Sequence, residues 1–136
     1  MTALSLFRRR PVEELDEIET YVEAYEVAAG TVVMKQGEPA GGFFYVLAGE
    51  FAVLHETGVR PVVLGTLGAG ACFGETGLLQ TGVHTATVRA VTDAEVAVLG
   101  ENELRSIIAD AVLTGVDLPT ATAAFVKLLD WGAELS

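Results

Sequence analysis

The sequence is poor in cysteine, histidine and basic residues. Its 136 residues include one cysteine, two histidines and eight lysines or arginines, against nineteen aspartates and glutamates. The single cysteine, Cys72, excludes an internal disulfide and fits a reducing compartment. His55 and His84 are too few for a metal cluster of several histidines with a carboxylate. The formal net charge of −11 argues against nucleic acid and anionic membranes as partners.

Long apolar runs are also missing. The longest, residues 43–48, is far too short to span a bilayer, and residues 1–10 lack the continuous apolar core of a signal peptide. The overall hydrophobic content is nevertheless 51%, which predicts a packed globule rather than a disordered chain. At this length we expect one domain, residues 1–136, in a soluble cytoplasmic protein.

The hydrophobic pattern changes its period along the chain. A helix is predicted over residues 11–26, because Pro11 suits a first helical turn and apolar residues then recur at helical spacing: Leu15, Ile18, Val22 and Tyr25. Residues 30–100 instead alternate in short runs separated by glycine-rich turns, with strands predicted at 31–35, 43–47, 50–55, 61–67, 85–91 and 95–99. This pattern predicts a mainly β protein with flanking helices, built as an antiparallel β-roll or jelly roll.

Two helices are predicted over residues 101–135, broken near residues 114–117. The last helix has an unusually wide apolar arc, formed by Leu118, Ala121, Ala124, Phe125, Leu128, Leu129, Trp131 and Leu135. Since a surface helix needs only one apolar stripe, this arc predicts burial both against the β-roll and against a partner. A homodimer through residues 118–135 is one expectation, and folding back of the arc onto its own subunit is the other.

A glycine-bracketed carboxylate follows Cys72. Gly74 and Gly77 free the backbone to approach a ligand closely, and the turn near Thr76 offers unpaired N–H groups to an anion. Glu75 can accept hydrogen bonds from hydroxyl groups. From the residues alone this is a small cradle for an anion and a hydroxyl, which by itself is a weak signal.

The stretch 72–90 resembles the phosphate-binding cassette of cyclic nucleotide-binding domains, found in catabolite-activator-type regulators, kinase regulatory subunits and gated channels. A second stretch, 33–49, resembles the other signature of this family, with four consecutive apolar residues between glycines. The resemblance implies a binding site for cAMP or cGMP, with no other cofactor, at Phe73, Gly74, Glu75, Thr76, Gly77, Leu78, His84, Thr85 and Ala86. One position departs from the family pattern: His84 stands where the family places its phosphate-binding arginine.

This departure leaves two interpretations of His84 open. The imidazole contacts the phosphate when it is protonated, or it is a remnant in a domain that takes another ligand or none. The resemblance implies a regulatory sensor domain with weakened or altered affinity, reporting to an effector protein. The alternative is a scaffold that binds no nucleotide and dimerises through its last helix.

Other function classes fit poorly. Cys72 and His84 could form a nucleophile–base pair, but no third orienting residue is evident, and we expect no enzyme activity. No residues remain after the last helix for a helix-turn-helix module, so we do not expect a transcription factor.

Overall fold

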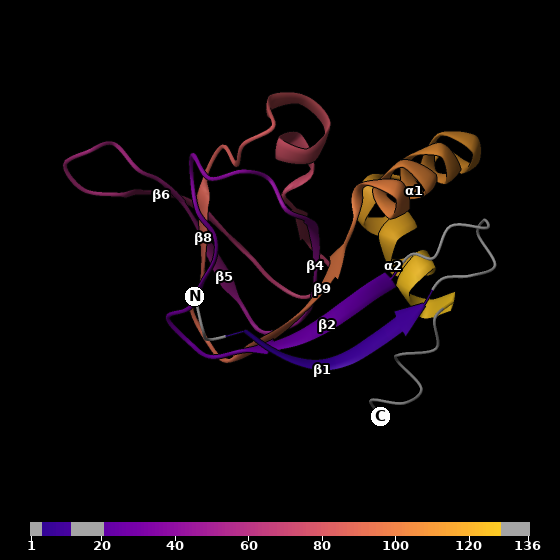
Figure 1. The fold of residues 1–136 in the computed structure, drawn as a ribbon, viewed down its shortest axis with the longest axis horizontal. Coiled ribbons are helices and arrows are strands. Elements are labelled where there is room, and N and C mark those ends of the chain that lie inside the picture. The colour runs from indigo at the N-terminus through magenta and orange to yellow at the C-terminus, as the bar shows by residue number, and fades with distance from the viewer. Residues whose placement is uncertain (1–3, 12–20, 129–136) are drawn as a thin grey trace.

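A computed structural model of the protein describes residues 4–11 and 21–128. Its elements follow one another as β1 (Leu4–Pro11), β2 (Tyr21–Val27), β3 (Val32–Met34), β4 (Phe43–Ala48), β5 (Phe51–His55), β6 (Val62–Leu67), β7 (Cys72–Phe73), the π-helical turn η2 (Gly77–Thr81), β8 (Thr87–Ala90), β9 (Ala94–Leu99), α1 (Glu101–Thr114) and α2 (Leu118–Leu128). Figure 1 shows the strands forming a roll with both α-helices at one end of it.

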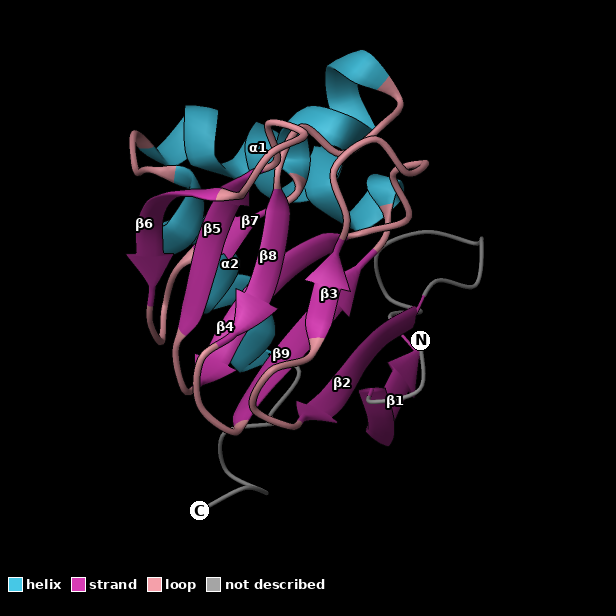
Figure 2. Ribbon diagram, turned by 90° about the vertical axis from the view of Figure 1, so that its left-hand side faces the viewer, coloured by secondary structure: helices cyan, strands magenta, loops and turns pink. Residues whose placement is uncertain are grey.

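The strands form two antiparallel sheets, one of five strands in the order β1-β2-β9-β4-β7 and one of four in the order β3-β8-β5-β6. Neighbours in the sheets are distant in the sequence, as when β8 pairs with both β3 and β5. Figure 2 shows this sheet in front, with the helices behind and above. The prediction of a mainly β protein with an antiparallel roll is confirmed.

Strand β4 explains why an unbroken apolar run lies in a strand. Phe43 belongs to the cluster that packs against the helices, and Tyr45 contacts the same cluster. Phe44 and Val46 point the other way, into the interior between the sheets. Because side chains alternate across a strand, a strand buried on both faces must be apolar at every position.

The α-helices cover the outer face of the five-stranded sheet. Leu104, Ile107 and Ala111 of α1 and Ala121 and Val126 of α2 are buried in one cluster with β4 and β9 residues. The start of α1 is capped by Glu103, whose Oε1 accepts a hydrogen bond from the Gly100 N–H at 2.9 Å. The predicted C-terminal helices are therefore present, whereas residues 129–135 of the last one lie outside the described part.

Neither described helix is long and apolar enough to cross a membrane alone. By length and composition, α1 and residues 118–127 of α2 meet that test only as a pair, bent by 114° at the break between them.

The predicted N-terminal helix, residues 11–26, is wrong where it can be checked. Pro11 ends strand β1, and Tyr21–Val27 is strand β2; the part from 12 to 20 lies outside the described residues. Val22 and Ala24 are both buried at 0% exposure, which is the period-two pattern of a strand. Pairing of β2 with β9 between Glu23–Val98 and Val27–Ala94 outweighs the local helical spacing.

Candidate functional site

Eight of the nine predicted ligand-binding residues line one pocket, which we call the cassette pocket. Its volume is about 230 Å³. It is lined by Met34, Val53, Leu67, Cys72, Phe73, Gly74, Glu75, Thr76, Gly77, His84, Thr85, Ala86 and Val88. The pocket thus joins the segment after β7 to the segment before β8, with the walls of the roll behind them.

Leu78 is the predicted residue that does not line the pocket. It lies in η2 and packs, with Leu79, against the cluster formed by the five-stranded sheet and the helices. Since Gly77 lines the pocket and Leu78 contacts the helical cluster, the short turn faces both the site and the helices.

Phe73 anchors the cassette to the roll. Phe73 pairs with Phe44 in the ladder between β7 and β4, and the two rings stack with centroids 4.8 Å apart and planes inclined by 4°. Phe51 of β5 meets the same ring at 5.8 Å. Both sheets therefore hold the start of the cassette through aromatic contacts inside the roll.

Neighbouring protein atoms leave no room for a side chain at Gly74 and Gly77. Gly74 has a φ of +94°, and a Cβ atom there would lie 2.9 Å from the Gly42 carbonyl oxygen. A Cβ atom on Gly77 would lie 2.9 Å from the Ala40 Cβ. A side chain at either position would therefore displace the neighbouring loop, whereas close approach to a ligand stays a prediction.

The backbone of His84 is fixed by the loop after β3. The Gly37 N–H donates to the His84 carbonyl at 2.8 Å, and the His84 N–H donates to the Glu38 carbonyl at 2.9 Å. Pro39 and Val83 form an isolated bridge beside them. His84 and Thr85 therefore precede β8, which starts at Thr87 and not at residue 85 as predicted.

The His84 side chain is buried and incompletely bonded. Its exposed fraction is 7%, and its Nδ1 atom has no hydrogen-bond partner among the described residues. Burial lowers the pKa of the imidazole, an effect that the nearby Glu38 carboxylate opposes. The ring is therefore neutral near pH 7 and offers one donor and one acceptor nitrogen.

The polar side chains around His84 include a carboxylate, a thiol and a hydroxyl. Glu75 is half-buried, Thr85 is exposed at the pocket edge, and no hydrogen bond among the described residues involves the Glu75 carboxylate. Burial raises the pKa of the Cys72 thiol to about 11. The thiol is protonated at neutral pH, so Cys72 is a poor nucleophile and the pair with His84 loses its chemical basis.

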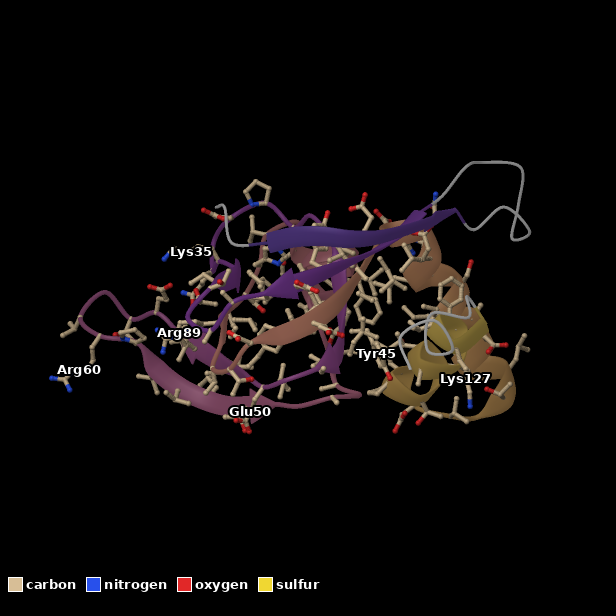
Figure 3. All side chains as sticks on the ribbon, turned by 90° about the horizontal axis from the view of Figure 1, so that it is seen from below. Lys35, Tyr45, Glu50, Arg60, Arg89 and Lys127 are labelled. Carbon is tan, nitrogen blue, oxygen red and sulfur yellow. The ribbon has the colours of Figure 1, made fainter. Side chains whose placement is uncertain are left out.

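No basic side chain lines the cassette pocket among residues 22–127. The lysines and arginines there are Lys35, Arg60, Arg89, Arg105 and Lys127. Figure 3 shows Arg60 and Lys127 at opposite ends of the molecule. Arg89 is exposed although Val88 beside it on β8 lines the pocket, because the two side chains leave opposite faces of the strand.

Sequence reasoning missed a polar network beside the pocket. The Thr87 hydroxyl donates to Glu56 Oε2 at 2.7 Å and accepts from the Gln36 N–H at 3.0 Å. Lys35 Nζ lies 2.9 Å from the same Glu56 oxygen. These residues are far apart in the sequence, and only the pairing of β3 and β5 with β8 brings them together.

The apolar pocket walls were also missed as site residues. Met34, Val53, Leu67 and Val88 come from β3, β5, β6 and β8. Their strands were predicted, but these four side chains were not predicted as site residues. Alternation within each strand was the available signal for which side chains face inward.

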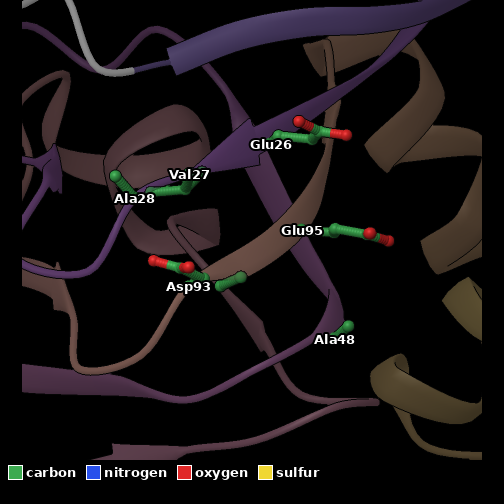
Figure 4. A pocket seen from close by; sticks show the side chains of 7 residues that line it. Glu26, Val27, Ala28, Ala48, Asp93 and Glu95 are labelled. Atoms are coloured by element: carbon green, nitrogen blue, oxygen red, sulfur yellow. The ribbon is translucent and has the colours of Figure 1, made fainter.

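A separate hollow of about 380 Å³ lies where β2 meets β9. Its lining includes Glu26, Asp93 and Glu95, and Figure 4 shows these carboxylates around it. Glu26 and Glu95 face each other in the strand pairing. Acidic walls repel an anionic ligand, so this larger hollow does not suit a phosphate. In the described part of the chain, no group of three or more histidine, cysteine, aspartate or glutamate residues is arranged to hold a metal ion.

Comparison with known proteins identifies the domain. The family model "Cyclic nucleotide-binding domain" matches residues 25–111. A cAMP-dependent protein kinase regulatory subunit of Pyricularia oryzae is 31% identical over 116 residues, covering 76% of this chain and 29% of the relative. A cyclic nucleotide-gated potassium channel of Mesorhizobium japonicum is 35% identical over 92 residues, covering 68% and 24%.

Solved structures share the fold. The regulatory domain of Toxoplasma gondii PKA, crystallised with cAMP, superposes with a TM-score of 0.61 at 19% identity, covering 78% of this chain and 39% of that one. The chain spans between 8% and 29% of the length of these and other curated relatives. The match of the family model over more than half of the sequence decides the assignment: this chain belongs to the cyclic nucleotide-binding domain family.

Proposed function

We propose that this domain is a regulatory sensor that binds a small ligand in the cassette pocket and has no catalytic activity of its own. One observation carries the proposal. Eight residues predicted from the sequence alone gather around a single pocket of about 230 Å³, although they come from two separate segments. Membership of the family supports a cyclic nucleotide as a ligand, and cAMP and cGMP are the candidates.

In this proposal Glu75 accepts a hydrogen bond from the ribose, and His84 contacts the cyclic phosphate when its ring is protonated. The unpartnered Nδ1 atom of His84 supports the second contact. An arginine would offer a fixed fork of donors that stays charged, whereas a buried imidazole must first gain a proton. Losing a charge-assisted contact costs about 1.5–3 kcal/mol, so we expect cyclic nucleotides to bind at least about tenfold more weakly than they would to an arginine-containing pocket.

The ligand signal would reach the helices through Cys72 and Leu78. Cys72 lines the pocket and also packs against the cluster that contains α1 and α2 residues. Leu78 contacts the same cluster, and the residue before it, Gly77, lines the pocket. A ligand that prefers one position of η2 would therefore shift the packing of the helices, which an effector protein can detect.

The proposal is tested by calorimetric titration with cAMP and cGMP at pH 6 and pH 8. Wild type should bind more tightly at pH 6, and His84→Arg should bind more tightly than wild type at both pH values. His55→Arg is the matched control, because His55 is exposed at the end of β5 and does not line the pocket. If neither wild type nor His84→Arg binds cAMP or cGMP at millimolar concentration, cyclic nucleotides are not the ligands of this pocket.

A scaffold that dimerises through its C-terminal helix is the second candidate. Two apolar side chains at the end of α1, the helix that precedes the C-terminal one, could extend such a contact: Val112 and Leu113 are 76% and 84% exposed. Exposed apolar side chains on a helix are candidates for burial by a second copy of the chain. Sedimentation equilibrium should then give a dimer that Leu113→Glu weakens. A monomer at tens of micromolar, in wild type, contradicts this candidate.

A further inference from the structure

The charges around the cassette pocket do not suit an anion. Glu75 carries the one formal charge among the described side chains that line it, because His84 is neutral near pH 7 and no lysine or arginine is present. Lys35 borders a neighbouring hollow together with His84, but its ammonium is paired with Glu56. A phosphate entering the pocket would therefore meet a carboxylate without a compensating cation.

The unused hydrogen-bonding groups favour hydroxyls over phosphate oxygens. Phosphate oxygens of a cyclic monophosphate only accept hydrogen bonds, and the Glu75 carboxylate also only accepts. A hydroxyl group both donates and accepts, so it can pair with Glu75 and with either nitrogen of the neutral His84 ring. The Nδ1 atom of His84 is buried without a partner, so a ligand hydroxyl that reaches it would satisfy an unmet hydrogen bond.

The rest of the lining is apolar. Met34, Val53, Leu67 and Val88 form walls inside the roll, and Phe73 stands at the start of the cassette. Walls of this kind bury the faces of a flat ring, while a few placed polar groups orient the remainder of the ligand. The pocket therefore combines a site for a ring with a site for hydroxyls, and its described lining has no lysine or arginine to neutralise a phosphate.

We propose that the ligand of the cassette pocket is an uncharged, ring-bearing polyol of the nucleoside class, and that the domain prefers a nucleoside to its 3′,5′-cyclic monophosphate at neutral pH. This inference rests on the proposed function, because it assigns the ligand class of the same pocket. In the nucleoside complex Glu75 accepts from a ribose hydroxyl, and His84 pairs with a second hydroxyl at the place where the cyclic phosphate would otherwise sit.

The test compares adenosine with cAMP, and guanosine with cGMP, by calorimetry at pH 7.5 in low salt. Wild type should bind one of the nucleosides about tenfold or more tightly than its cyclic monophosphate. His84→Arg should reverse this order, because it adds the missing cation. Glu75→Gln should reduce the discrimination against the cyclic phosphate, because it removes the repelling charge while keeping a carbonyl acceptor.

Controls separate the two proposals. His55→Arg should keep the wild-type order, and circular dichroism melting checks that each variant is folded. Tighter binding of the cyclic monophosphate than of the nucleoside by wild type overturns this inference and leaves the sensor proposal standing. Absence of binding by all four ligands, in both wild type and His84→Arg, overturns the sensor proposal and this inference with it.

Discussion

Gly77 leaves the space that the imidazole of His84 occupies. A Cβ atom on Gly77 would lie 3.3 Å from Nδ1 of His84, 3.0 Å from the Val83 carbonyl oxygen and 2.9 Å from the Ala40 Cβ. The two halves of the cassette and the loop after β3 therefore meet at one point. The position of His84 in the pocket depends on the absence of a side chain at Gly77.

Gly77→Ala should destabilise the fold by about 1–3 kcal/mol, because the added methyl group overlaps atoms of two other segments. Urea denaturation followed by circular dichroism measures this change. Gly68→Ala is the matched control, because a Cβ atom there meets nothing within 4 Å and the backbone is not in the left-handed region. Equal stability of the two variants would contradict the close packing described for Gly77.

The stability of the ligand-free domain should fall in acid partly because of His84. Burial lowers the pKa of His84 below its ordinary value of 6.5, so folding favours the neutral ring. The stability that this provides is complete above pH 6.5 and is lost as the pH falls through the lowered pKa. His84 also borders a second hollow, where Lys35, Glu38 and Tyr25 are the titratable neighbours, and it shares the lining of the cassette pocket with Glu75 and Cys72.

His84→Gln should therefore be less sensitive to acid than wild type between pH 7 and pH 5, whereas His55→Gln should follow wild type. Thermal melting at a series of pH values provides the comparison. The account of His84 is incorrect if His84→Gln and wild type lose stability in parallel over this range.

Thr87→Val should destabilise the roll by about 1–3 kcal/mol although the substitution preserves shape. It leaves the N–H of Gln36 without its acceptor at a site where Thr87 is 2% exposed. It should also raise the pKa of Glu56, which the Thr87 hydroxyl and then Lys35 hold below its ordinary value. The lowered pKa stabilises the fold fully above the ordinary value of Glu56, and this stability is lost as the pH falls from there through the lowered pKa. Wild type should therefore lose more stability than Thr87→Val over that range.

Carboxyl resonances in NMR titration report the pKa of Glu56 directly. Thr92→Val is a comparison variant, because Thr92 is exposed and bonds Glu50 N–H and the Asp93 carbonyl at a distant turn. An unchanged Glu56 titration in Thr87→Val would show that the network does not set this pKa.

Cys72 should react slowly with thiol reagents in the folded state. Burial raises its pKa to about 11, so only about a thousandth of the thiol is ionised at pH 8. The rate with iodoacetamide should increase steadily up to pH 10 and should rise sharply on addition of denaturant. Fast alkylation of the native protein at pH 8, with a plateau below pH 9, would instead indicate an activated cysteine.

Much of the fold could be predicted because its signals are local. The alternating strands and their glycine turns identified the roll, and β4 was recognised within one residue of its observed end. The N-terminal helix failed because strand β2 is determined by its pairing with β9, far along the chain. The two-residue strand β7 was missed as a strand because Cys72 and Phe73 are too few to show a period.

The cassette residues could be listed from the sequence because they are nearly contiguous and follow a fixed spacing. The charge states of these residues could not be predicted from the sequence. The lowered pKa of His84 depends on its burial in the folded domain, and the exposure of Arg89 depends on the register of β8 with β5. Long-range pairing decides such properties, and a single sequence does not reveal it.

The titration of the His84 imidazole by NMR, with and without millimolar cAMP, tests the central claim most directly. If the phosphate meets this ring, the pKa of His84 should rise on addition of cAMP. By linkage, cAMP affinity should then fall as the pH rises through the pKa of the free ring and continue to fall up to the pKa of the bound one. A His84 titration that cAMP leaves unchanged, in a protein to which cAMP binds, would contradict the placement of the phosphate at His84.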